Sequence, residues 1–225
     1  MKLMLEALSR LSEVAPNSYE LLLFQAQDAE ARGDDVAAIG YYQEAIRKKP
    51  DAVGVHYGLG VVYVESGKYD EAAQEFQKEL QINPNDSLAL WRLGDLELRT
   101  DSREAKDHLE RAVSLNPDLP QAVLAYGRAL LKTGDLKDAV SEFYRVVQLA
   151  PEEDSVHYLL ATAYRRLGRE EEAKEETARF EALAKIKSDR RMQLAREIVE
   201  RGRKAQESVP DIEPGFSSGR SPQHP

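Results

Sequence analysis

The side chains best suited to acid–base or metal chemistry are four histidines and two runs of glutamates. They are His56, His108, His157 and His224, with Glu170–Glu172 and Glu175–Glu176. His56 and His157 lie far apart in the sequence, and neither has a second ligand at metal-binding spacing. The glutamates are interspersed with Lys and Arg on a segment of helical periodicity, which is typical of a solvated, salt-bridged face. We therefore predict that the chain is not an enzyme, with no catalytic residue, no metal site and no cofactor.

Composition narrows the class of protein further. The chain has 225 residues, of which 40 are acidic and 31 basic, and a net charge of −9 argues against a general nucleic-acid binder. The absence of cysteine excludes disulfides and thiolate ligands. No apolar run reaches the ~20 residues that span a bilayer. The N-terminus lacks the features of a signal peptide. We expect a cytoplasmic protein, or a periplasmic one if the chain is a fragment.

Prolines divide the sequence into units of nearly constant length. Successive intervals of 34, 34, 33 and 34 residues separate Pro16, Pro50, Pro84, Pro117 and Pro151. Two further sets keep the same phase: alanines at Ala38, Ala72, Ala105, Ala139 and Ala173, and large side chains at Tyr42, Phe76, Leu109 and Phe143. A fixed period of this length indicates a repeat architecture.

Each unit reads as two helices. Apolar residues recur at three- and four-residue spacing over residues 51–65, and Gly67 then supplies a turn. A second helix is predicted over Tyr69–Ile82, ending before Pro84 because proline cannot continue a helix. Small residues such as Gly60 allow the two helices of a unit to approach closely.

The best copy of the unit is His56-x-x-Leu59-Gly60-x-x-Tyr63, followed by Ala72-x-x-x-Phe76 and Pro84. It resembles the tetratricopeptide repeat. The resemblance implies an all-α fold, a right-handed α-solenoid of antiparallel helix pairs. The texture of the fifth unit is similar to that of bacterial members, so we expect a bacterial origin.

The proline period sets the predicted domain limits. We predict a half-repeat (second helix only) or N-terminal cap at 1–16, followed by repeats at 17–50, 51–84, 85–117, 118–151 and 152–184. The third repeat is one residue short. A basic capping helix at 185–206 and a disordered tail at 207–225 complete the chain.

Function is expected on the concave side of the stack, which the first helices line. The resemblance implies a protein–protein interaction scaffold that holds a partner segment in this groove. The predicted contacts are Tyr57, Val61, Leu88, Trp91, Arg92, Arg128, Lys132, Tyr158 and Arg165. Aromatic residues beside arginines suit an interaction hot spot, and the cations favour a partner with acidic as well as apolar residues. The alternative is that Trp91 packs into a neighbouring helix and the cations balance nearby acids.

One subclass of the family can be tested by position. Co-chaperone members hold a terminal carboxylate with Lys, Asn and Arg side chains on three successive first helices. The matching positions here carry Leu23, Gln27, Gly58, Leu88 and Arg92, of which only Arg92 agrees. We therefore predict no carboxylate clamp.

The two ends of the chain offer alternative functions. Residues 3–14 read as a second helix without its first helix, with Met4, Leu8 and Leu11 on the inward face. The chain is then part of a longer array, which we favour, or this segment caps the stack, or its face pairs with another copy in a homo-oligomer. Residues 185–204 carry eight Lys or Arg against three Asp or Glu. They could bind an anionic membrane or nucleic acid, although we expect neither as the main partner.

Overall fold

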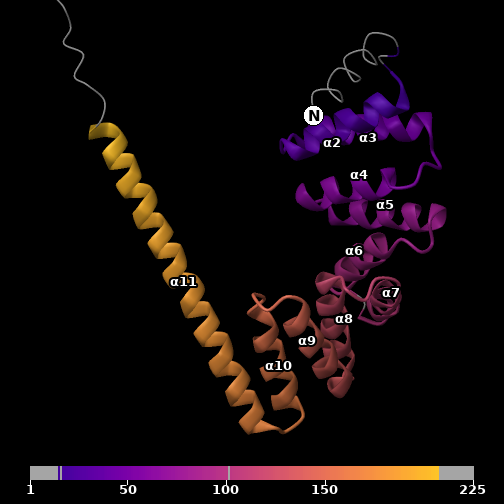
Figure 1. Cartoon of the computed structure of the whole chain (residues 1–225). Helices are drawn as coiled ribbons and strands as arrows, with labels where there is room; N and C mark the ends of the chain where they lie inside the picture. The colour runs from indigo at the N-terminus through magenta and orange to yellow at the C-terminus, as the bar shows by residue number, and fades with distance from the viewer. Residues whose placement is uncertain (1–14, 16, 101, 208–225) are drawn as a thin grey trace, which may run out of the picture. The chain divides into compact units, whose positions relative to one another are not determined.

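The computed structural model describes residues 15, 17–100 and 102–207 (Figure 1). Every regular element within these residues is a helix. The helices are α2 (Tyr19–Ala31), α3 (Asp35–Lys48), α4 (Val55–Glu65), α5 (Tyr69–Ile82), α6 (Ser87–Glu97), α7 (Ser102–Leu115), α8 (Pro120–Thr133), α9 (Leu136–Leu149), α10 (Ser155–Arg166) and α11 (Glu170–Glu207). The predictions for residues 1–14 and 208–225 lie outside the described residues. None of the helices within the described ranges is long and apolar enough to cross a membrane.

Several helices begin at a polar side chain that caps their free amides. Ser18 Oγ accepts from the Leu21 amide at 3.3 Å, and Asp86 Oδ1 accepts from the amides of Leu88 and Ala89 at 2.9 and 3.0 Å. Such caps satisfy backbone donors that have no partner within the helix. These caps therefore define where the helices predicted from the periodicity begin.

Helix α4 begins later than the sequence predicts. Periodicity starts at residue 51, but the helix starts at Val55 because Gly54 adopts a φ of 86°, in the left-handed region that ends regular helix geometry. Gly54 has no side chain to cap the helix. The carboxylate of the fully buried Glu79 takes over this role, accepting from the Gly54 amide at 2.8 Å and the Tyr57 amide at 3.3 Å.

The two helices of a repeat pack closely through small residues. A Cβ on Gly60 would lie 2.6 Å from the Phe76 ring, and one on Gly127 would lie 2.5 Å from the Phe143 ring. Both rings are fully buried and occupy the same position of the second and fourth repeats. The glycines therefore allow large side chains of the second helix to fill the core against the first helix.

From α2 to α10 each helix packs on the next along the chain, so the pairs form a stack (Figure 1). In addition, first helices of neighbouring repeats contact each other: α2 with α4, α6 with α8, and α8 with α10. The expected all-α solenoid of antiparallel helix pairs is confirmed.

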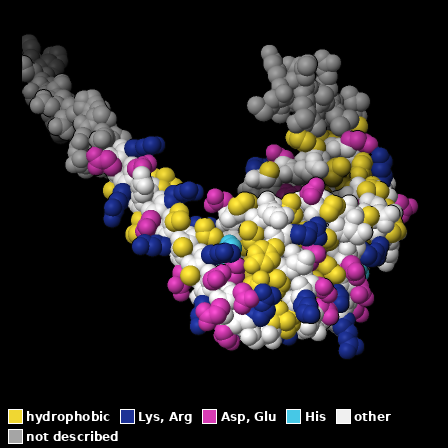
Figure 2. Space-filling model, turned by 60° about the horizontal axis from the view of Figure 1, so that its bottom comes forward, with side chains coloured by type: hydrophobic (Ala, Val, Ile, Leu, Met, Phe, Trp, Pro, Cys, Tyr) yellow, Lys and Arg dark blue, Asp and Glu magenta, His cyan; other side chains and the backbone are white. Residues whose placement is uncertain are grey.

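Helix α11 extends well beyond the second helix of a repeat. The chain divides into two compact units after Phe180, so α11 contributes to both. Taken by itself, its C-terminal part exposes Ile186, Leu194, Ile198 and Val199 as well as basic side chains (Figure 2). The capping role assigned to residues 185–206 stays a prediction.

Candidate functional site

The nine predicted contact residues all lie on first helices. Helix α4 carries Tyr57 and Val61; α6 carries Leu88, Trp91 and Arg92; α8 carries Arg128 and Lys132; and α10 carries Tyr158 and Arg165. We call the surface that these side chains and their equivalents on α2 form the inner face.

The apolar members of the inner face differ in how much surface they offer. Leu88 and Tyr158 are 38% and 56% exposed, although the Tyr158 ring also lies 6.0 Å from the ring of Phe180. Tyr57 is half-buried, with its ring 5.8 Å from that of Phe76. Trp91 packs against a buried cluster contributed by the neighbouring helices, as the alternative interpretation expected. Leu88 and Tyr158 therefore provide the largest exposed apolar surface among these residues.

Several cations of the inner face bond to the protein itself. Lys132 donates to the carbonyl of Leu98, and Arg166, one repeat further on, donates to the carbonyl of Leu131. The two bonds are equivalent: in each, a cation near the end of a first helix satisfies a carbonyl at the end of the preceding first helix. A cation in this position also interacts favourably with the negative end of the helix dipole.

The other predicted cations also have neighbours. Arg128 forms an ion pair with Asp95 at 3.2 Å, and Arg165 donates to Thr177 Oγ1 at 2.9 Å. Arg92 stacks its guanidinium over the Trp91 ring, 4.4 Å from the centroid, and its buried Nε has no hydrogen-bond partner. Each of these cations therefore has a neighbour within the stack, and their role as contacts for an acidic partner stays a prediction.

A cavity that the sequence did not predict opens on the inner face between α2 and α4. It has a volume of about 350 Å³ and is lined by Gln27, Glu30, Ala31, Tyr42, Gly54, Tyr57, Gly58 and Val61. The Tyr42 hydroxyl donates to Glu30 Oε2 at 2.7 Å. The Tyr42 ring fits here because Gly58 has no side chain: a Cβ at this position would lie 2.6 Å from the ring. The available sequence signal was a glycine on α4 that the repeat pattern does not require.

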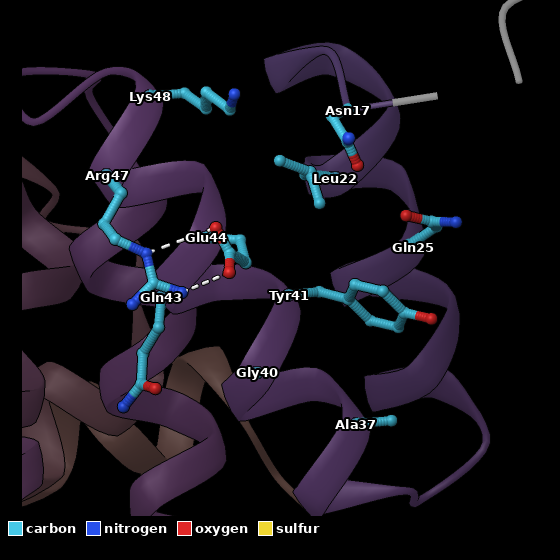
Figure 3. Close-up of a pocket in the computed structure, with 10 residues that line it drawn as sticks. All are labelled: Asn17, Leu22, Gln25, Ala37, Gly40, Tyr41, Gln43, Glu44, Arg47 and Lys48. Carbon is cyan, nitrogen blue, oxygen red and sulfur yellow. Dashed lines mark hydrogen bonds and ion pairs between the residues drawn. The ribbon is translucent and has the colours of Figure 1, made fainter. Parts of the chain in front are cut away.

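A larger cavity of about 690 Å³ lies on α2 and α3, at the N-terminal end of the described stack (Figure 3). Its lining includes Leu22 and Gln25 from α2 and Tyr41, Glu44 and Arg47 from α3. Arg47 Nε donates to Glu44 Oε2 at 3.2 Å within it. We call it the end-face cavity. The self-association that the sequence suggested involves the inward face of residues 3–14, which lie outside the described residues.

Two histidines that suggested chemistry have the same structural environment. Nδ1 of His56 lies 2.6 Å from Glu75 Oε2, and Nδ1 of His157 lies 2.6 Å from Glu176 Oε2. All four residues are buried. In each pair, the histidine of a first helix is held by a glutamate of the second helix in the same repeat. No group of three or more potential ligands that could hold a metal occurs among the described residues.

The chain resembles parts of larger proteins. It is 27% identical to anaphase-promoting complex subunit 3 of Schizosaccharomyces pombe over 164 residues, 72% of this chain and 25% of that protein. It is 33% identical to protein O-mannosyl-transferase Tmtc1 of Drosophila melanogaster over 122 residues, 51% of this chain and 14% of that protein. It thus spans a quarter or less of either relative.

A solved structure and two family models agree on the architecture. YrrB, described as a TPR protein with an unusual peptide-binding site, is 24% identical and superimposes with a TM-score of 0.70, covering 79% of this chain and 92% of YrrB. Tetratricopeptide repeat models match residues 5–53, 25–87, 57–102 and 88–154, and residues 130–182. With the proline period and the stacked helix pairs, these matches show that the chain belongs to the tetratricopeptide repeat family.

Proposed function

We propose that this protein is a non-enzymatic interaction scaffold whose inner face holds a segment of a partner protein. The observation that carries the proposal is the row of side chains on successive first helices, which combines exposed Leu88 and Tyr158 with the cavity between α2 and α4. Exposed apolar groups with polar groups around them are typical of partner-binding surfaces. The names of two similar proteins, a subunit of a complex and a peptide-binding repeat protein, support the same class of function.

We propose that the apolar residues of the inner face contribute more to partner binding than its cations do. Leu88, Tyr158, Tyr57 and Val61 contribute apolar surface, whereas Lys132 and Arg165 act mainly within the stack. The partner segment therefore needs apolar side chains more than a row of carboxylates. A cytoplasmic location and a bacterial origin stay predictions.

Selection of short random peptides displayed on phage tests the scaffold function. We expect the wild type to select a set of related peptides and the double variant Leu88→Glu, Tyr158→Glu to lose them. The matched control is Val36→Glu on α3, because Val36 is 84% exposed and lies outside the inner face. Equal binding by the double variant would show that the inner face is not the binding surface.

The end-face cavity favours a second candidate function, self-association. A large cavity with the half-buried Tyr41 ring and the buried Leu22 could receive a helix from another copy. Light scattering of the wild type and of Tyr41→Glu tests this. A dimer that the substitution dissociates supports the end face as an assembly surface, and a monomeric wild type excludes it.

Binding of an anionic surface by residues 185–204 also stays a prediction, tested by salt-sensitive binding to anionic vesicles.

A further inference from the structure

The cavity between α2 and α4 contains a carboxylate without a cation. Glu30 lines the cavity, and it forms no ion pair with any residue that the structure describes. The other two acids of α2 are neutralised: Glu20 pairs with Lys49 at 2.9 Å and Asp28 with Arg32 at 3.0 Å. The negative charge of Glu30 is therefore available on the inner face.

A hydrogen bond from the buried Tyr42 hydroxyl fixes the orientation of the Glu30 carboxylate. Tyr42 is 2% exposed, and its hydroxyl donates to Oε2 of Glu30. Burial, and then the hydrogen bond to Glu30, raise the pKa of the Tyr42 hydroxyl. The hydroxyl thus stays protonated and continues to donate, which leaves Oε1 of Glu30 for a second donor.

The remaining walls suit a long side chain with a positive end. Val61 and Ala31 supply aliphatic surface, Gln27 supplies an exposed amide, and the half-buried ring of Tyr57 forms one side. A Lys or Arg side chain can bury its aliphatic stem against such walls and pair its charge with a carboxylate. An aromatic ring nearby adds an attraction for the cation, whereas an acidic side chain would be repelled by Glu30.

We propose that this cavity binds the side chain of a lysine or arginine presented by the partner segment. The inference rests on the proposed function, since it specifies one residue of the segment that the inner face holds. It also reverses the charge expected of the partner from sequence. The site is built from two repeats, with the carboxylate on α2, the orienting hydroxyl on α3 and the aromatic wall on α4.

The same peptide selection tests the charge preference. We expect peptides selected by the wild type to be enriched in Lys or Arg at one position relative to the unselected library. The affinity of a selected peptide should fall about tenfold for Glu30→Gln, the loss expected for one charge-assisted hydrogen bond. Asp28→Asn is the matched control, because it removes one acidic charge from the same helix outside the cavity, and it should bind as the wild type does.

A second variant keeps the test independent of folding. Gln27 is exposed at the cavity, so Gln27→Lys adds a cation there without disturbing buried groups, and it should weaken the same peptide. Replacing the cationic residue of the peptide by methionine should weaken its binding to the wild type. The same replacement should not weaken binding to the Glu30→Gln variant, which already lacks the carboxylate. Variants of the peptide with Lys or Arg at that position show which of the two the cavity prefers.

The outcomes separate this inference from the proposed function. Peptides that depend on Leu88 and Tyr158 but show no enrichment in cations, or that bind Glu30→Gln equally well, overturn the cation site and leave the scaffold function. Enrichment in Asp or Glu overturns the cation site too. A wild type that selects no peptides contradicts the scaffold function itself.

Discussion

Removal of the Glu79 carboxylate should loosen the start of α4 and destabilise the protein. The side chain is fully buried on α5 and accepts hydrogen bonds from the amides of Gly54 and Tyr57. Glu79→Ala deletes both acceptors from a helix start whose N-cap residue is glycine. Because Tyr57 is one of the two residues released, the perturbation also reaches the inner face.

The size of the effect follows from the two bonds. The 2.8 Å bond to Gly54 involves an ionised acceptor, and such bonds contribute about 1.5–3 kcal/mol. The 3.3 Å bond to Tyr57 is longer and adds about 0.5–1 kcal/mol. Rehydration of the freed amides offsets part of this sum, so we expect Glu79→Ala to lower the free energy of unfolding by about 2–3 kcal/mol. Glu79→Gln retains one oxygen acceptor and should lose about 1 kcal/mol.

Urea unfolding followed by circular dichroism measures the global effect, and amide hydrogen exchange at Gly54 and Tyr57 measures the local one. The local measurement is needed because arrays of repeats can unfold in parts. The control is Gln77→Ala on the exposed side of the same helix, expected to change stability by less than about 0.5 kcal/mol. A Glu79→Ala variant as stable as this control, with unchanged exchange at both amides, would refute the capping role.

Three further predictions concern packing, pH and the stack. Gly60→Ala should cost about 1–3 kcal/mol in thermal unfolding, because the new methyl group would overlap the buried Phe76 ring. The hydrogen bond to Glu97 raises the pKa of His108 above its ordinary value of 6.5, so this pair should stabilise the fold fully below pH 6.5 and lose its contribution as the pH rises through the raised pKa. Urea unfolding of Glu97→Gln across this range should show the largest deficit at the acidic end. Lys132→Met should lower stability by about 1 kcal/mol in urea unfolding, through the lost bond to the Leu98 carbonyl after α6, and leave peptide affinity unchanged.

Matched substitutions distinguish these effects from general perturbation. Gly40→Ala adds a methyl group that meets nothing within 4 Å in the middle of α3, so it should not destabilise the protein. Lys137→Met removes an exposed lysine from α9 and should leave stability unchanged within about 0.5 kcal/mol. Loss of stability in either control would contradict the specific contacts named above. A deficit of Glu97→Gln that does not vary with pH would contradict the role of His108.

The helix pairs could be predicted because their determinants repeat along the chain. Proline, small residues and large residues recur at one period, and Tyr69–Ile82 is predicted and observed with the same limits. The start of α4 could not be predicted, because it depends on Gly54 adopting a positive φ and on Glu79 reaching it from the following helix. The latter contact crosses 25 residues and has no counterpart in the repeat pattern.

The candidate site was predictable by helix but not by contact. Periodicity placed the nine residues on first helices correctly. It could not show that Lys132 reaches a carbonyl 34 residues earlier, because that bond depends on the spacing between neighbouring repeats. The cavity escaped prediction for the same reason: Glu30, Tyr42 and Gly58 belong to three different helices and meet only when two repeats stack.

The central claim is that the inner face holds the partner segment, and hydrogen–deuterium exchange with a selected peptide bound tests it most directly. We expect protection to increase on the first helices α2, α4, α6 and α10 and to stay unchanged on the exposed sides of α3 and α5. Protection confined to the second helices, to the end-face cavity or to residues 185–201 would contradict the claim and move the binding surface elsewhere.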